Sequence, residues 1–354
     1  MPQRPHSATL SRQRGPTLVY GAMTQPLSQP TDPARGDEIL RLQQLSKTFR
    51  VGFWAKRVHA VRDVNAVMYR GESLGYLGPN GSGKTTSIKC LLALIQPTAG
   101  KVELFGRSPT DPAARARVGY LPESPYFYDY LTPVEIFEYV GKLYGLDART
   151  RRSRTQELLG IVGLDLAAKR PLRGFSKGML QRVGIAQSLI ADPDLLIWDE
   201  PLSGLDPLGR KEIRELMIEL RRQGKSLFFS SHVLTDIEAL CDGVCILDRG
   251  VAVAQGRLSE LLHRDALESE ALLQLPPDPA QSAAVQVQLG NIPDLQLKQL
   301  PIGVQAVLPT DRVPELMRVL LEGGGQLREL TARRDSLEDL FMRKALQRSD
   351  EGRP

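Results

Sequence analysis

Residues 78–85 read Gly-Pro-Asn-Gly-Ser-Gly-Lys-Thr, and Thr86 follows them. The stretch matches the pattern GxxxxGK[ST], in which glycines let a loop turn tightly and aim its backbone N–H groups at phosphate oxygens. In such a loop the lysine reaches the outer phosphates and the last hydroxyl is a ligand for Mg²⁺. The residues predicted to bind nucleotide phosphates are Gly78, Pro79, Asn80, Gly81, Ser82, Gly83, Lys84, Thr85 and Thr86, with Thr85 also a metal ligand.

The segments on either side of this loop are those that its chemistry requires. Residues 72–77 (ESLGYL) predict a short buried strand, and residues 86–95 predict an apolar helix. The loop is therefore expected at a helix N-terminus, where free N–H groups and the helix dipole attract anions. This context favours a phosphate site over a chance glycine-rich turn.

A pair of carboxylates follows a second apolar run. Residues 194–200 read DLLIWDE, which predicts a buried parallel strand with Asp199 and Glu200 at its carboxyl end. Ligands bind at that edge of open α/β sheets. We expect Asp199 to hold Mg²⁺, directly or through water, and Glu200 to orient or deprotonate an attacking water.

Further motifs lie around this pair. Residues 175–201 (FSKGMLQRVGIAQSLIADPDLLIWDEP) resemble the signature segment of ABC-type ATPases, whose usual form is LSGGQ. Residues 203–206 (SGLD) resemble the D-loop of that family, and residues 230–232 (SSH) resemble its switch histidine. The resemblance extends from about residue 39 to residue 258. It is closest to the ATP-binding subunits of ABC-2-type exporters, because of the SKGM signature and the sequence SLEDLF at 336–341.

The resemblance implies a fold, an activity and partners. The expected fold is α/β: a P-loop NTPase cassette of the ABC type with a helical signature subdomain, plus a small α+β accessory domain at the C-terminus. The expected activity is ATP hydrolysis that powers export through a separate membrane permease, at the cytoplasmic face of the membrane. Two ATP-binding subunits, identical or not, would enclose two ATP molecules.

The same resemblance implies roles for single residues. Ser176 and Gly178 open a helix that would face the γ-phosphate held by the other subunit, with Asp206 at the contact between subunits. Lys84, Glu200 and His232 are the expected catalytic residues, His232 by touching the γ-phosphate.

Two departures from the family pattern leave questions open. Glu123 stands where the family usually has a glutamine that ligates Mg²⁺ or water, and it adds negative charge beside Glu200. Lys177 and Met179 replace the usual Gly and Gln, and Lys177 either contributes charge to phosphate or faces solvent.

Phe49 holds the place of an aromatic residue that stacks on adenine. Phe53 and Trp54 follow and are alternatives, and a third interpretation is a hairpin that packs on itself.

The composition of the chain and the positions of its breaks suggest the domain organisation. Residues 1–36 are rich in Pro, Gln, Ser and Thr and are expected to be a disordered tail, or in part an artefact if Met23 is the true start. The ATPase domain is expected over 37–264, the accessory domain over 265–348 and a short tail over 349–354. In the accessory domain, alternating stretches such as 284–289 and 303–308 are typical of strands. A helix is expected over 312–321, a strand over 326–330 and a last helix over 336–346.

The composition limits the classes of function. The 354 residues are 42% hydrophobic, carry a net charge of +5 and contain no run of 18 apolar residues, so we expect no membrane span. The three cysteines, Cys90, Cys241 and Cys245, are expected to be free thiols. Just before a helix expected over 133–144, with Thr132 as its cap and Pro133 at its first position, Tyr126, Phe127 and Tyr128 are expected either to dock the permease or to pack locally.

Two alternatives to transport remain. One is a soluble ABC-type ATPase that acts on nucleic acid or ribosomes. It is disfavoured because Lys84 and Asp199 are too close in sequence for an inserted coiled coil and the chain carries a single cassette, so we expect no nucleic-acid partner. The other is a regulatory protein that binds ATP and barely hydrolyses it, an idea motivated by Glu123.

Overall fold

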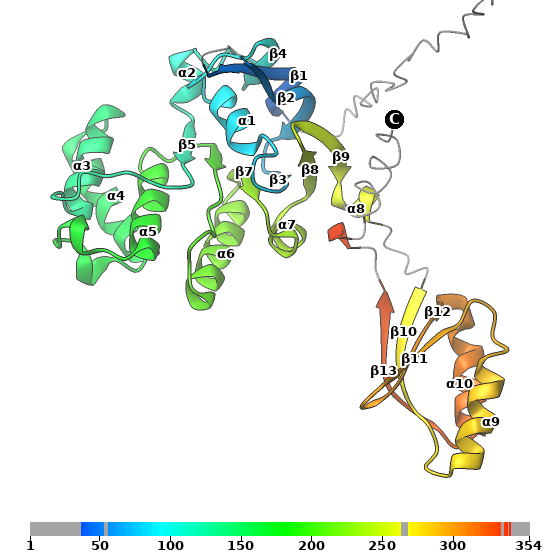
Figure 1. Cartoon of the computed structure of the whole chain (residues 1–354). Coiled ribbons are helices and arrows are strands. Elements are labelled where there is room, and N and C mark those ends of the chain that lie inside the picture. The colour runs from blue at the N-terminus through cyan, green and yellow to red at the C-terminus, as the bar shows by residue number, and fades with distance from the viewer. Residues whose placement is uncertain (1–36, 53–55, 263–267, 334–335, 339, 341–354) are drawn as a thin grey trace, which may run out of the picture. The chain divides into compact units, whose positions relative to one another are not determined.

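In the computed structural model a central sheet carries the predicted phosphate loop (Figure 1). The structure describes residues 37–52, 56–262, 268–333, 336–338 and 340. The sheet has six strands in the order β5-β6-β7-β3-β8-β9. They are β3 (Ser73–Leu77), β5 (Val118–Leu121), β6 (Leu195–Trp198), β7 (Ser226–Ser231), β8 (Gly243–Asp248) and β9 (Val251–Arg257). All pairings are parallel except β8 with β9.

The inner strands of this sheet are apolar because both of its faces are covered. Every residue of β3, β6 and β7 is buried, as is typical of parallel sheets in α/β proteins. The predicted strands at 72–77 and 194–200 are therefore present, each within one or two residues of its expected bounds.

A second sheet is antiparallel. Two of its strands come before the phosphate loop in the sequence, and the third comes after it. Its order is β2-β1-β4, from β1 (Glu38–Val51), β2 (Lys56–Tyr69) and β4 (Ala99–Leu104). Side chains from all three strands, among them Leu42, Met68 and Leu104, join one buried cluster with β3 and α1 residues such as Tyr76 and Ile88. This packing fixes the second sheet against the base of the loop.

The helices of the cassette are α1 (Lys84–Leu91), α2 (Pro112–Arg115), α3 (Pro133–Leu143), α4 (Ala148–Ile161), α5 (Lys177–Leu189), α6 (Pro207–Arg222), α7 (Leu234–Leu240) and α8 (Leu258–Leu261). Helix α1 begins two residues earlier and ends four residues earlier than the apolar pattern over 86–95 predicts. The loop itself leads into its first turn, and the helix ends at its C-cap Leu92, after which Ala93 has a φ of 54° and turns the chain away. Helices α3, α4 and α5 form the helical segment of the cassette, seen in green in Figure 1.

Capping explains where two of these helices start. Thr132 and Glu135 exchange hydrogen bonds in a capping box before Pro133, as Thr132 followed by Pro at the first position predicts. Ser176 caps α5 by accepting from the Met179 N–H. Helix α5 then buries Val183, Ile185 and Leu189 in the cluster shared with α3, α4 and α6.

Residues 268–333 form an α+β unit of their own. Its elements are β10 (Glu268–Gln274), α9 (Pro279–Leu289), β11 (Gln296–Leu300), β12 (Gly303–Pro309), α10 (Val313–Glu322) and β13 (Gln326–Arg333). The sheet order is β11-β12-β10-β13, with all pairings antiparallel. This is the split βαβ arrangement, with both helices on one face of the sheet (Figure 1).

One element of this unit was predicted wrongly. The alternating stretch over 284–289 is typical of a strand, yet it lies inside α9. Asp278 caps the helix and Pro279 is its first residue, so the helix has started before the alternating stretch at 284–289. Val285 and Leu289, one helical turn apart, are the residues that become buried. The predicted strands at 303–308 and 326–330 and the helix at 312–321 are present.

The end of the described chain packs on the cassette. Leu337 and Leu340 are buried in the same apolar cluster as Ile237 and Leu240 of α7. The Leu337 N–H donates to Glu238 Oε1 at 2.6 Å. The predicted helix over 336–346 extends into residues outside the described range.

The described residues contain no helix that is long and apolar enough to cross a bilayer. The three cysteines are free, as predicted, with Cys90 and Cys245 buried. Burial raises the pKa of the Cys245 thiol to about 12.

Candidate functional site

Four neighbouring strands of the central sheet end at one edge, and a predicted site residue follows each of them. Glu123 follows β5, Asp199 and Glu200 follow β6, His232 follows β7, and the phosphate loop follows β3. Because parallel strands present their carboxyl ends at the same edge, residues separated by more than 150 positions in sequence meet there.

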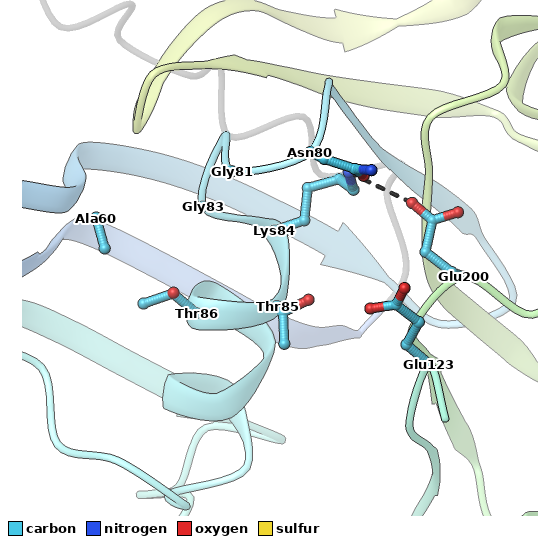
Figure 2. Close-up of a pocket in the computed structure, with 9 residues that line it drawn as sticks. All are labelled: Ala60, Asn80, Gly81, Gly83, Lys84, Thr85, Thr86, Glu123 and Glu200. Carbon is cyan, nitrogen blue, oxygen red and sulfur yellow. Dashed lines mark ion pairs between the residues drawn. The ribbon is translucent and has the colours of Figure 1, made fainter. Parts of the chain in front are cut away.

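The Lys84 ammonium of the phosphate loop is buried and has partners within the chain. Lys84 Nζ donates to the carbonyl oxygen of Gly78 at 2.6 Å and lies 3.3 Å from Glu200 Oε1. The side chains of Lys84 and Glu200 are 6% and 9% exposed, so water screens this ion pair little. Figure 2 shows the pair, with Thr85 and Glu123 directed into the same space.

Gly83 is required at the turn into α1. Its φ is 106°, and a Cβ there would lie 2.5 Å from the carbonyl oxygen of Ala60. Both the left-handed backbone and the close approach of β2 exclude a larger residue.

A cleft of about 250 Å³ opens beside this loop. Its lining residues are Ala60, Asn80, Gly81, Gly83, Lys84, Thr85, Thr86, Glu123 and Glu200. Ala60 was not predicted, because it comes from the antiparallel sheet and no motif marks it. Gly78, Pro79 and Ser82 are part of the loop but do not line the cleft.

Ser230 links the Asp199 carboxylate to the backbone of Glu200. Its Oγ donates to Asp199 Oδ1 at 2.5 Å and accepts from the Glu200 N–H at 2.9 Å. Sequence reasoning gave this serine no role. The signal available was a hydroxyl near the end of a buried strand, which must find partners once it is removed from water.

Glu200 is held in an unusual backbone conformation. Its φ is 50°, in the left-handed region that non-glycine residues rarely occupy. Its Oε2 lies 2.8 Å from His232 Nδ1, so the carboxylate stands between the histidine and Lys84. Strain of this kind costs about 1–3 kcal/mol and is concentrated at functional sites.

The donor set fits a hard divalent cation. Asp199 Oδ2 is buried and lacks a hydrogen-bond partner in the described part of the chain, whereas Glu200 Oε1 is buried with the Lys84 ammonium 3.3 Å away. Unsatisfied buried oxygens near a hydroxyl such as that of Thr85 are what Mg²⁺ prefers as ligands. Burial raises the pKa of Tyr120 on β5 to about 12, and the Asp199 charge adds to this effect in a smaller degree. The Tyr120 phenol therefore stays neutral.

The signature residues lie outside the cleft. Ser176 and Gly178 are at the N-terminus of α5 and do not line the cleft that holds Lys84. The Lys177 side chain is exposed and lies over Gly204, where an added Cβ would be 2.7 Å from its Nζ. Within this chain Lys177 therefore contacts the loop that follows Glu200.

Phe49 also lies outside the lining of the cleft. It is 36% exposed, it pairs with Val58 in the β1–β2 hairpin, and the Lys47 ammonium lies 5.1 Å from its ring. The two alternatives, Phe53 and Trp54, are outside the described residues. Adenine stacking by Phe49 stays a prediction.

The aromatic loop before α3 divides into two kinds of residue. Tyr126 and Tyr128 are 93% and 60% exposed, whereas Phe127 packs against the main apolar cluster. Phe127 therefore anchors the loop, whereas Tyr126 and Tyr128 expose most of their surface, with the Tyr128 ring 5.8 Å from that of Tyr130.

Comparisons with known proteins agree with this geometry. The family model "ABC transporter" matches residues 61–203. A Synechocystis protein described as an uncharacterized ABC transporter ATP-binding protein is 38% identical over 92% of this chain and 90% of its own length. The bacitracin transport ATP-binding protein of Bacillus licheniformis is 35% identical over 80% of this chain and 92% of its own.

A solved structure shows the same fold. It is described as an ATP-binding subunit of an ABC transporter, is 33% identical, and superposes with a TM-score of 0.57 over 63% of this chain and 91% of the other.

Proposed function

The chain belongs to the ATP-binding proteins of ABC transporters, and from that premise we propose that it powers export through a separate membrane permease. As a member of this family it is an ATPase of a transport system. One observation supports this proposal: four parallel strands end at the same edge of the sheet, and this edge holds Lys84, Asp199, Glu200, Glu123 and His232.

We assign the residues of the phosphate loop to the triphosphate. The loop residues that line the cleft, Asn80, Gly81 and residues 83–86, would turn their backbone amides to the phosphates, and Lys84 would leave Glu200 to bind the outer phosphate oxygens. Thr85 and Asp199 would hold Mg²⁺, with Glu123 as a further oxygen ligand. The metal would neutralise charge on the phosphates.

Glu200 and His232 are assigned to the attacking water. Glu200 sits at the edge of the cleft with its second oxygen fixed by His232, so it can accept a proton while the imidazole holds it in place. Such a base typically contributes about 10²–10⁴ in rate.

A second copy of the cassette, or a related subunit, is assigned to complete the site. In this proposal Ser176 and Gly178 of one subunit face the γ-phosphate bound by the other, because the free N–H groups of α5 suit an anion. Asp206 would lie at the contact between the two subunits.

The direction of transport and the membrane partner are inferred from three features: the name of a relative, the signature segment and the aromatic loop. The relative from Bacillus licheniformis is named for bacitracin transport, and the SKGM signature matches the exporter branch. Tyr126 and Tyr128 provide exposed aromatic side chains, which are enriched where proteins bind one another. We place the protein at the cytoplasmic face of the membrane, docked by these tyrosines.

The test changes both tyrosines in the full chain, expressed with its native membrane proteins. Tyr126→Ala with Tyr128→Ala should release the ATPase from the membrane fraction while basal ATP hydrolysis in solution is unchanged. The control is Tyr144→Ala at the other end of α3, a tyrosine 43% exposed, about 16 Å along the helix axis. Retention of the double variant on the membrane at the level of the control would refute this docking site.

A further inference from the structure

One buried carboxylate near the site has no part in the roles assigned above. Asp236 lies in the first turn of α7 and is 0% exposed. Arg210 Nη2 donates to its Oδ2 at 2.9 Å, and Arg214 Nη2 donates to its Oδ1. Both arginines come from one face of α6, since they are four residues apart. A single buried charge therefore joins α7 to α6, and the two helices lie beside each other (Figure 1).

Each of these two helices follows a strand that leads into a proposed catalytic residue, β6 into Glu200 and β7 into His232. The chain turns after Glu200, where the Ser203 N–H donates to the Glu200 carbonyl oxygen at 3.0 Å, and Asp206 then caps α6. On the other side, α7 begins two residues after His232. Glu200 leads into the helix that carries the arginines, and His232 leads into the helix that carries the aspartate.

The result is a closed ring of contacts. His232 and Glu200 meet at 2.8 Å, and the helices that follow them meet again at the Asp236 carboxylate. A small cavity of about 120 Å³ lies inside the ring, lined among others by Glu200, Gly204, Arg210, His232 and Asp236. The second contact restricts how far His232 can move relative to Glu200.

Helix α7 is held through Ile237 and Leu240 in the main apolar cluster, and Asp236 adds a polar contact in its first turn. The helix spans seven residues, and no side chain caps its N-terminus. Short helices are marginal without tertiary contacts. Among its charged residues, Asp236 is buried and doubly paired, whereas Glu238 is exposed.

We propose that Asp236 is a positioning residue for ATP hydrolysis, which acts by holding His232 against Glu200. Its loss should lower the rate of hydrolysis and leave the binding of Mg-ATP unchanged, because the phosphate loop lies on β3 and does not contact α7 through this ion pair. The inference rests on the proposed roles of Glu200 and His232.

The test is a double-mutant cycle in the full chain with Mg-ATP as the probe. Asp236→Asn should lower kcat about 10- to 100-fold, with a Kd for Mg-ATP within threefold of that of the unmodified protein. In a His232→Ala background, Asp236→Asn should lower kcat no further, since the residue it positions is gone.

The matched control is Asp242→Asn. Asp242 follows α7 and pairs with Arg221, also on α6, at 2.7 Å, but it does not line the cavity. It should change kcat by less than threefold. An equal loss in this control would reduce Asp236 to a structural ion pair and overturn the proposal.

The remaining outcomes separate two failures. If His232→Ala hydrolyses ATP at the unmodified rate, the proposed role of His232 fails and the inference falls with it. If His232→Ala is impaired and Asp236→Asn reduces kcat by its full factor again, only the inference fails. If circular dichroism shows that Asp236→Asn does not fold, Arg214→Met takes its place in the same cycle, because that side chain is 37% exposed and Arg210 still pairs with Asp236.

Discussion

The replacement of Glu200 by glutamine makes the strongest test of the proposed site. Glutamine keeps the size of the side chain and removes the charge that lies 3.3 Å from Lys84 Nζ. Two consequences follow, one for chemistry and one for binding. Without the carboxylate no base accepts a proton from water, so kcat for ATP hydrolysis should fall by about 10²–10⁴.

The effect on binding can be estimated from the ion pair. At 3.3 Å and an effective dielectric constant of about 20, the attraction between Lys84 and Glu200 is about 5 kcal/mol before desolvation. ATP must replace this attraction with its own phosphates, and desolvation offsets much of it. If about 2–3 kcal/mol is released to nucleotide binding, Mg-ATP should bind the variant about 30- to 150-fold more tightly.

The assay measures phosphate release and, separately, the titration of a fluorescent ATP analogue in the presence of Mg²⁺. Glu157→Gln is the control, since Glu157 is an exposed carboxylate on α4 that pairs with Arg154. A kcat within threefold of the unmodified protein would refute the role of Glu200 as base. Unchanged affinity with lost activity would show that Glu200 does not compete with phosphate for Lys84.

Three further changes test other parts of the structure. Lys84→Met removes the charged donor of the phosphate loop and should weaken Mg-ATP binding about 10- to 100-fold by calorimetry; retained affinity would contradict the assignment of the loop. Glu123→Gln keeps an oxygen ligand and removes one negative charge from the lining of the cleft, so Mg-ATP should bind about 3- to 10-fold more tightly at low salt and the gain should shrink at high salt. Weaker binding would show that the charge of Glu123 is needed to hold Mg²⁺. Because burial raises the pKa of Cys245 to about 12 while an unfolded thiol titrates near ~8.5, its contribution to stability is intact below about pH 8.5 and is lost as the pH rises toward 12. The urea midpoint should fall over that range by less in Cys245→Ala than in the unmodified protein, and equal slopes would show that this thiol does not titrate with unfolding.

Several features of the site follow from local sequence alone. The sequence predicts the glycine-rich loop between an apolar strand and a helix. It also predicts the acidic pair after a second apolar strand, because each of these features depends on residues that are close together in the chain. Caps work in the same way, so Thr132 and Ser176 mark the starts of α3 and α5. The family resemblance rests on such local patterns, and the relatives confirm it.

Local patterns fail where two signals compete over a few residues. The alternation over 284–289 suggests a strand, but a cap and a proline just upstream had already started a helix. Likewise the aromatic loop reads as a row of equivalent residues, and only packing separates Phe127 from its exposed neighbours.

By itself, then, the sequence determines which residues can bind phosphate and metal and which can activate water. The tertiary structure decides how they meet. Strand β7 inserts between β6 and β3, which places Ser230 against both Asp199 and Glu200. It also brings α7 against α6, so that Asp236 meets two arginines. Strand order and helix docking depend on pairing between distant segments, and that information is spread over the whole core, where no short motif can record it.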